Sequence, residues 1–159
     1  MALFEIRIDD LSSDPVRELL NIHLSGMHES SPPGHVHALD LAGLRAPNVT
    51  VWSAWAGTAL AGIAALKVHD AATGELKSMR THPAQLRQGV GSALLAHVVR
   101  EARRRGLDRL GLETGRGPAF EPALALYRRY GFVEGDVFGD HRPSDFSRFL
   151  HLDLRHLST

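Results

Sequence analysis

The chain has 159 residues, with 18 Lys or Arg balanced by 18 Asp or Glu, so its formal net charge is zero. The balance favours neither nucleic acid nor an anionic membrane as a partner, and the lack of cysteine excludes disulfides, thiolate metal ligands and a cysteine nucleophile. No apolar run approaches the ~20 residues that span a bilayer. We therefore expect one cytoplasmic domain over residues 1–159, a length at which a single core can form.

Hydrophobic periodicity predicts a strand and two helices in the first third of the chain. Residues 2–8 alternate between apolar and polar side chains, which is typical of a strand. Asp14 and Pro15 suit the start of a helix whose apolar face continues to Met27. The Ser-Ser-Pro-Pro-Gly run that follows cannot stay helical, and a short helix is expected over residues 40–45.

Three strands are expected next, over residues 49–56, 59–68 and 75–81, and the turns between them make them antiparallel neighbours. An amphipathic helix then ends near Gly106. Further elements are expected in the order strand, helix, strand and strand, over residues 107–113, 120–130, 132–138 and 146–154. The predicted fold is α/β (α+β), with a mixed, mostly antiparallel sheet of about seven strands and about four helices.

A glycine-bearing loop before the amphipathic helix is the strongest functional feature. Its glycines let the backbone approach a ligand closely, and the amides and dipole of a helix N-terminus attract anions. The loop predicts a pyrophosphate site made by Arg87, Gln88, Gly89, Val90, Gly91 and Ser92. It is not the nucleotide-hydrolase loop, which has lysine after its second glycine, nor the dinucleotide loop, whose third glycine is replaced here by Leu94.

Two segments resemble the GNAT superfamily of N-acetyltransferases. The family's cofactor motif, [QR]-x-x-G-x-[GA], is similar to residues 86–91 (LRQGVG), where both glycines match but Leu86 stands in the Gln or Arg position and the basic residue is one place later. Residues 123–132 (ALALYRRYGF) are similar to the family's A-x-x-x-Y-x-x-x-G-F ending. The resemblance covers about residues 49–154 and is closest to a small bacterial single-domain subgroup.

The resemblance implies direct attack of an amine on the thioester of acetyl-CoA, without a metal. Tyr127 is then the acid that protonates the departing thiolate, although its helix face also suits a core residue. Glu75 is the first candidate for the base, and it is equally compatible with a solvated position after a turn. Glu113 is the second candidate, while His82 has a suitable intrinsic pKa but stands in the loop region.

The walls of the site are also implied by the resemblance. Met79, Arg80 and Thr81 should border the acyl group, with a backbone amide as the donor to its oxygen, and Thr114 should border the cofactor. His37 and Asp40, in the loop after the first helix, should face the substrate together with Glu113, although the loop also reads as a surface connection.

We expect the partner to be an amine of a small molecule or a peptide, with no nucleic acid and no membrane. A homodimer through a sheet edge is common in the family. Two alternatives remain open, namely transfer of another acyl group from CoA and a CoA-binding sensor without turnover.

Overall fold

Seven strands among the described residues form one sheet, and the computed structural model describes residues 4–30, 41–139 and 141–155. The strands are β1 (Glu5–Ile8), β2 (Val49–Ala56), β3 (Ala59–Val68), β4 (Thr73–Thr81), β5 (Arg109–Thr114), β6 (Val133–Glu134) and β7 (Arg148–Asp153). The helices are α1 (Asp14–Ser30), α2 (Leu41–Leu44), α3 (Val90–Arg104) and α4 (Glu121–Arg129), with 3-10 turns at Pro83–Gln85 and Pro118–Phe120.

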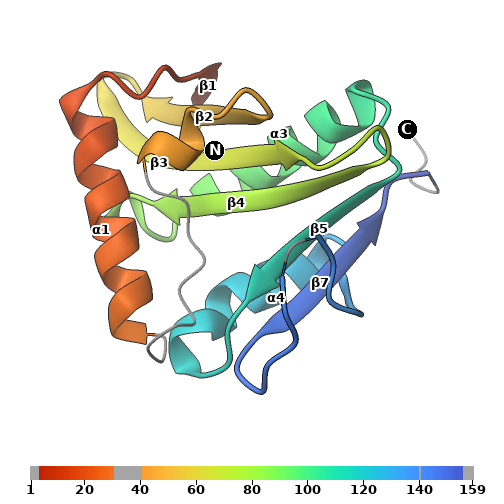
Figure 1. Ribbon diagram of the computed structural model, residues 1–159. Helices are drawn as coiled ribbons and strands as arrows, with labels where there is room; N and C mark the ends of the chain where they lie inside the picture. The colour runs from red at the N-terminus through yellow and green to blue at the C-terminus, as the bar shows by residue number, and fades with distance from the viewer. Residues whose placement is uncertain (1–3, 31–40, 140, 156–159) are drawn as a thin grey trace.

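The spatial order of the sheet is β1-β2-β3-β4-β5-β7-β6 (Figure 1). Every neighbouring pair is antiparallel except β4 and β5, which are parallel. The prediction of a mixed, mostly antiparallel sheet with about seven strands and about four helices is therefore confirmed. The three strands predicted in series after residue 48 are antiparallel neighbours, as expected.

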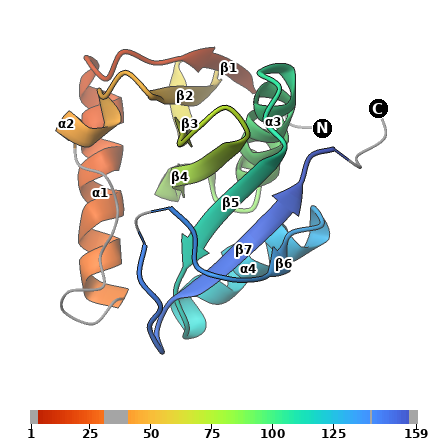
Figure 2. The ribbon, with the colours of Figure 1, turned by 45° about the vertical axis from the view of Figure 1, so that its right-hand side comes forward.

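Both faces of the sheet are covered, with α1 and α2 on one face and α3 and α4 on the other (Figure 2). Strand β3 shows why its sequence is apolar throughout. Ile63 and Ala65 pack into the cluster beneath α1, whereas Ala64 and Leu66 pack into the larger cluster beneath α3. A strand buried on both sides has no polar face, so its residues do not alternate.

The prediction of a strand over residues 132–138 is wrong in its length, because β6 contains only Val133 and Glu134. The Gly135 amide still donates to the Phe149 carbonyl of β7 at 2.9 Å, but the strand does not continue beyond it. Phe138 then turns inward and packs its ring against Gly111 of β5. The other boundaries differ from the predicted ones by a few residues.

The strands β4 and β5 separate along their length. Their pairing involves only residues 73–75 of β4 and residues 109–111 of β5. Beyond this short parallel contact the two strands diverge, as Figure 1 shows between the labels β4 and β5. Among the described residues, no helix is long and apolar enough to cross a membrane.

Candidate active site

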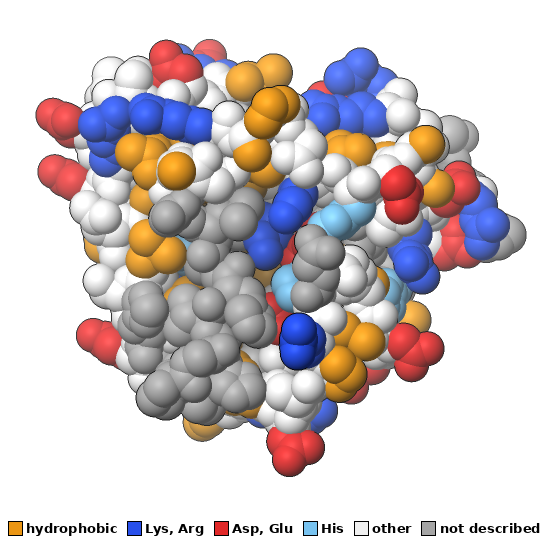
Figure 3. All heavy atoms as spheres, in the orientation of Figure 1, with side chains coloured by type: hydrophobic (Ala, Val, Ile, Leu, Met, Phe, Trp, Pro, Cys, Tyr) orange, Lys and Arg blue, Asp and Glu red, His pale blue; other side chains and the backbone are white. Residues whose placement is uncertain are grey.

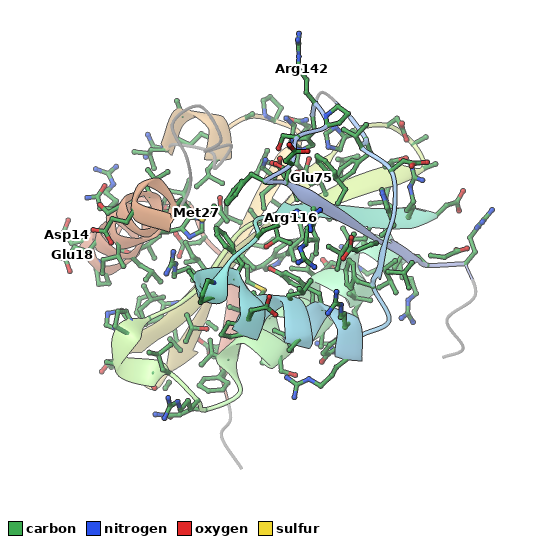
Figure 4. The ribbon with its side chains drawn as sticks, turned by 90° about the horizontal axis from the view of Figure 1, so that it is seen from below. Asp14, Glu18, Met27, Glu75, Arg116 and Arg142 are labelled. Carbon is green, nitrogen blue, oxygen red and sulfur yellow. The ribbon has the colours of Figure 1, made fainter. Side chains whose placement is uncertain are left out.

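A cavity of about 490 Å³ occupies the opening between β4 and β5. Its walls come from the second half of β4, the end of β5, the C-terminal half of α1 and the first turns of α4. Figure 4 shows Met27 on the side of α1 that is turned toward Glu75 and Arg116, while Asp14 and Glu18 lie on the outer side. The cavity therefore opens between the two halves of the sheet.

A β-bulge lies at the middle of the cavity wall formed by β4. The pairing of β3 with β4 runs from Ala65–Lys77 to Ile63–Arg80, so Ser78 and Met79 together face one residue of β3. Ser78 has a φ of 53°, which is uncommon for a residue with a side chain. Such a bulge interrupts the ladder and redirects backbone groups. The neighbouring edge, toward β5, has no pairing partner past residue 75 in the described part of the chain.

The glycine loop lies at one end of this cavity, which Leu86 and Gly91 both line. Gly89 is the N-cap of α3 with a φ of 84°, and it provides no side-chain cap. The first helical hydrogen bond joins the Ala93 amide to the Gly89 carbonyl at 3.0 Å. The amides of the three preceding helical residues have no acceptor within the helix, so the N-terminus of α3 can bind an anion. Arg87 is exposed beside it.

Ser92, which was predicted at the pyrophosphate site, makes hydrogen bonds with Tyr130. Its hydroxyl lies 3.1 Å from the hydroxyl of Tyr130, which also donates to the Ser92 carbonyl at 3.1 Å. These bonds tie the first turn of α3 to the end of α4. Tyr130 also packs against the main core cluster.

Tyr127 reaches the cavity from α4, and it is also a core residue. Only 8% of it is exposed, and its ring lies 5.9 Å from that of Phe132. Burial raises the pKa of Tyr127 to about 12, so its hydroxyl is protonated at neutral pH. The two interpretations of this residue, proton donor and core side chain, are thus compatible.

Glu75 lies on the cavity floor, 1% exposed, and it is not solvated. The Nε2 atoms of His69 and His141 each donate to its carboxylate at 2.8 Å, and Nζ of Lys77 lies 3.4 Å away. Burial alone raises the pKa of Glu75, but the hydrogen bond from His141 and the charge of Lys77 outweigh burial. The pKa is lowered to about 2, so Glu75 is ionised at neutral pH.

Several predicted residues meet at the same place. Glu113 and Thr114, at the end of β5, line the cavity, and Oε1 of Glu113 lies 3.4 Å from Nδ1 of His141. His82 accepts the Ala84 amide at 3.0 Å and caps the 3-10 turn. His37 and Asp40, predicted on the substrate side, lie outside the described residues.

Sequence reasoning missed His69, His141 and Lys77. His141 is 66 positions from Glu75 and lies between the last two predicted strands, so no local pattern connects the two residues. Lys77 and His69 flank Glu75 closely in sequence, but charged residues near a turn are ordinarily solvated. Only the fold of the chain after β6 brings these side chains together. Among the described residues, no group of three or more His, Cys, Asp or Glu has an arrangement that could hold a metal ion.

Comparison with known proteins agrees with this geometry. The model of the acetyltransferase (GNAT) family matches residues 14–132, three quarters of the chain. The chain belongs to the GNAT family. As a GNAT protein it is an acyl-CoA-dependent acetyltransferase, and both segments singled out in the sequence, residues 86–91 and 123–132, lie within the matched region.

Two GNAT relatives are similar over nearly their whole length. The uncharacterized N-acetyltransferase YedL of Escherichia coli K12 is 49% identical over 152 residues, covering 96% of both chains. YsnE of Bacillus subtilis 168, also an uncharacterized N-acetyltransferase, is 48% identical over 145 residues, covering 91% of this chain and 96% of the relative.

Solved GNAT structures show the same fold. A Klebsiella pneumoniae protein assigned as an acyl-CoA N-acyltransferase superposes with a TM-score of 0.81, at 26% identity and with 97% of this chain and 99% of the other covered. A Bacillus subtilis acetyltransferase in complex with CoA has a TM-score of 0.70, at 21% identity, with 95% and 99% covered.

Proposed function

We propose that this GNAT protein transfers the acetyl group of acetyl-CoA to an amine by direct attack. The observation that carries the proposal is the open edge of β4. This edge is bulged at Ser78, unpaired toward β5 beyond residue 75 within the described chain, and bordered at its end by the amides that begin α3. One continuous track of hydrogen-bonding backbone thus leads from an anion site into a cavity that contains a protonated tyrosine.

The residues of this track suit the parts of acetyl-CoA in order. The amides of Val90, Gly91 and Ser92, with Arg87, bind the pyrophosphate. The unpaired edge of β4 offers donors and acceptors to the amide groups of the pantetheine arm, in the manner of an added strand. A backbone amide near Met79 to Thr81 stabilises the negative charge that develops on the carbonyl oxygen. Thr114 borders the same arm from β5.

Tyr127 is the proposed acid. As the amine nitrogen forms its bond to the acyl carbon and the carbon–sulfur bond breaks, the sulfur takes a proton from the Tyr127 hydroxyl. The amine gives up one proton to the surroundings and the tyrosinate takes one up, so the products are the amide and the CoA thiol, and protons and charge balance. Burial keeps this hydroxyl protonated at neutral pH, so its proton is in place when the sulfur leaves.

The reaction also needs a group that accepts the proton of the amine. Glu75 is a poor direct base, because a carboxylate with a pKa of about 2 holds a proton weakly at neutral pH. We propose that Glu75, which lines the cavity, instead holds His69 and His141 in place by hydrogen bonds, with Glu113 on the other nitrogen of His141. A base role for Glu75 stays a prediction, as do the cytoplasmic location and the homodimer.

The direct test is release of CoA thiol with acetyl-CoA and a panel of amines. We expect Tyr127→Phe to lower kcat by roughly 10²-fold or more, with little change in acetyl-CoA affinity. Tyr130→Phe is the matched control, because it removes a hydroxyl from the same helix that bonds only to Ser92 in the described structure. Equal activity of the two variants would remove Tyr127 from the mechanism, and a wild type that binds acetyl-CoA but acetylates no amine would refute the proposed function.

A further inference from the structure

Three charged side chains of β4 point to the same face of the sheet. Glu75, Lys77 and Arg80 pair with Lys67, Ala65 and Ile63 of β3 respectively. Because paired residues of neighbouring strands share a face, and those three residues of β3 alternate on the α1 face, the three charged residues face α1. Without the bulge, Met79 would follow Lys77 on this face. The bulge therefore exchanges a methionine for an arginine on the α1 side of the cavity.

Arg80 is held in place by neutral groups. Its Nε donates to Nδ1 of His23 at 3.1 Å, and one terminal nitrogen donates to the His23 carbonyl at 3.4 Å. The guanidinium lies so close to α1 that a Cβ at Gly26 would be 2.8 Å from that nitrogen. His23 is 7% exposed, and burial together with the Arg80 charge lowers its pKa to about 4. His23 therefore fixes the arginine without neutralising it.

The charge of Arg80 has no carboxylate partner within 4.0 Å among the described residues, whereas Lys77 beside it pairs with Glu75. Arg80 is also half-buried and lines the cavity. A partly desolvated guanidinium without a counter-ion costs free energy unless an anion binds to it. Figure 3 shows Lys, Arg and His side chains gathered around the middle of the face that is hollowed there.

We propose that Arg80 binds a carboxylate of the acceptor, so that the substrate class is amines that also carry a carboxylate, such as amino acids and short peptides. The inference rests on the proposed function. Its geometry is a cationic group on the α1 wall and the carboxylates of Glu75 and Glu113 on the floor and the β5 wall of one cavity. A zwitterion fits this separation of charge, with its carboxylate at Arg80 and its amine nearer the carboxylates.

The position of Arg80 assigns the carboxylate to the acceptor rather than to the acyl donor. The donor follows the edge of β4 that faces β5, in the proposed function. The Arg80 side chain leaves the face of the strand and reaches α1, which is the opposite wall of the cavity from α4 and Tyr127. A guanidinium also binds a carboxylate through two parallel hydrogen bonds, which orients the acceptor as well as holding it.

The test compares acids with their own carboxamides in the thiol-release assay. The panel contains α-amino acids, amino acids with a longer spacing between amine and carboxylate, and dipeptides, each beside its carboxamide. Arg80→Gln removes the charge, Arg80→Lys restores it without the planar fork, and Arg100→Gln removes one exposed charge from the outer surface of α3 as a control. Acetyl-CoA affinity is measured for each variant by calorimetry. The difference in amine pKa between an acid and its amide cancels when variant and wild type are compared.

We expect the wild type to acetylate at least one acid, and Arg80→Gln to lower kcat/KM for it by roughly 10- to 100-fold with no loss for the carboxamide. Arg80→Lys should recover part of the loss, and Arg100→Gln should show none. A wild type that acetylates the carboxamides but none of the acids, or equal losses for acid and amide in Arg80→Gln, would overturn the inference while leaving the proposed function intact. A change confined to the choice between acetyl-CoA and succinyl-CoA would also overturn it, because the carboxylate would then belong to the donor.

Discussion

The ionisation state of a side chain at this site depends more on its contacts than on its residue type. Glu75 is ionised because His69, His141 and Lys77 surround it, and the same contacts couple it to stability. Its pKa is about 2 in the folded chain against 4.5 for a model carboxyl group. A lowered carboxyl pKa stabilises the fold above about pH 4.5, and this contribution is lost as the pH falls from 4.5 toward 2.

Glu75→Gln should therefore lower the free energy of unfolding by an amount on the order of 3 kcal/mol at pH 7, since it removes the charge that the two histidines and the lysine surround. Thermal unfolding followed by circular dichroism at pH 7 and near pH 2.5 measures the effect. The difference between variant and wild type should shrink in acid. Equal melting temperatures at pH 7 would contradict the importance of this network.

The lowered pKa of His23 predicts a second pH dependence of folding stability, over a different pH range. Its pKa of about 4 lies below the ordinary 6.5, because it is buried and lies beside Arg80. As the pH falls from 6.5 to 4, the unfolded chain takes up the proton first, so stability decreases over that range. His23→Asn keeps an acceptor near the Nδ1 position and removes the titration. Its unfolding free energy should vary less with pH between 6.5 and 4, and an unchanged slope would show that other groups cause it.

At the level of elements, the bulge in β4 forms the site. Ser78 is held at a φ of 53°, a conformation that costs little for glycine and most for β-branched residues. Ser78→Val should reduce stability by about 1–3 kcal/mol and should impair acetyl transfer as the bulge distorts. Ser78→Gly should be at least as stable as the wild type. Denaturant unfolding measures the stability of both variants. A valine variant as stable as the glycine variant would contradict the claim that Ser78 is held in a strained conformation.

The elements differ in how far the sequence predicts them. The amphipathic period of α3 and the hairpin turns between β2, β3 and β4 are local signals, and they were read correctly. The strand predicted over residues 132–138 was wrong in its length, because the chain turns after Gly135 and buries Phe138 against Gly111, a contact between distant parts of the chain. The bulge also depends on a partner strand, so no local pattern in the sequence predicts it.

For the whole molecule, the fold class and the antiparallel pairing of β2, β3 and β4 follow from element types and connection lengths. Element types and connection lengths do not predict which side chains meet at the cavity. The glycine loop and Tyr127 belong to sequence motifs that single them out, whereas no motif predicts the Ser92–Tyr130 bond. His141 reaches Glu75 across 66 positions, and Arg80 reaches α1 only because of the bulge. These contacts arise from tertiary structure, which no periodicity in the sequence encodes.

The central claim, that this cavity accepts acetyl-CoA with its pyrophosphate at the start of α3, is tested most directly by calorimetric titration of CoA and acetyl-CoA. The wild type is compared with Gly89→Glu and Gly106→Glu. The two glycines have φ values of 84° and 82°, and a Cβ at either would meet nothing within 4 Å, but they lie at opposite ends of α3. Both variants thus carry the same backbone strain, and only Gly89→Glu adds a negative charge at the anion site. We expect Gly89→Glu to weaken binding roughly 100-fold and Gly106→Glu to bind as the wild type does. Equal binding by both variants, or no binding by the wild type, would contradict the account.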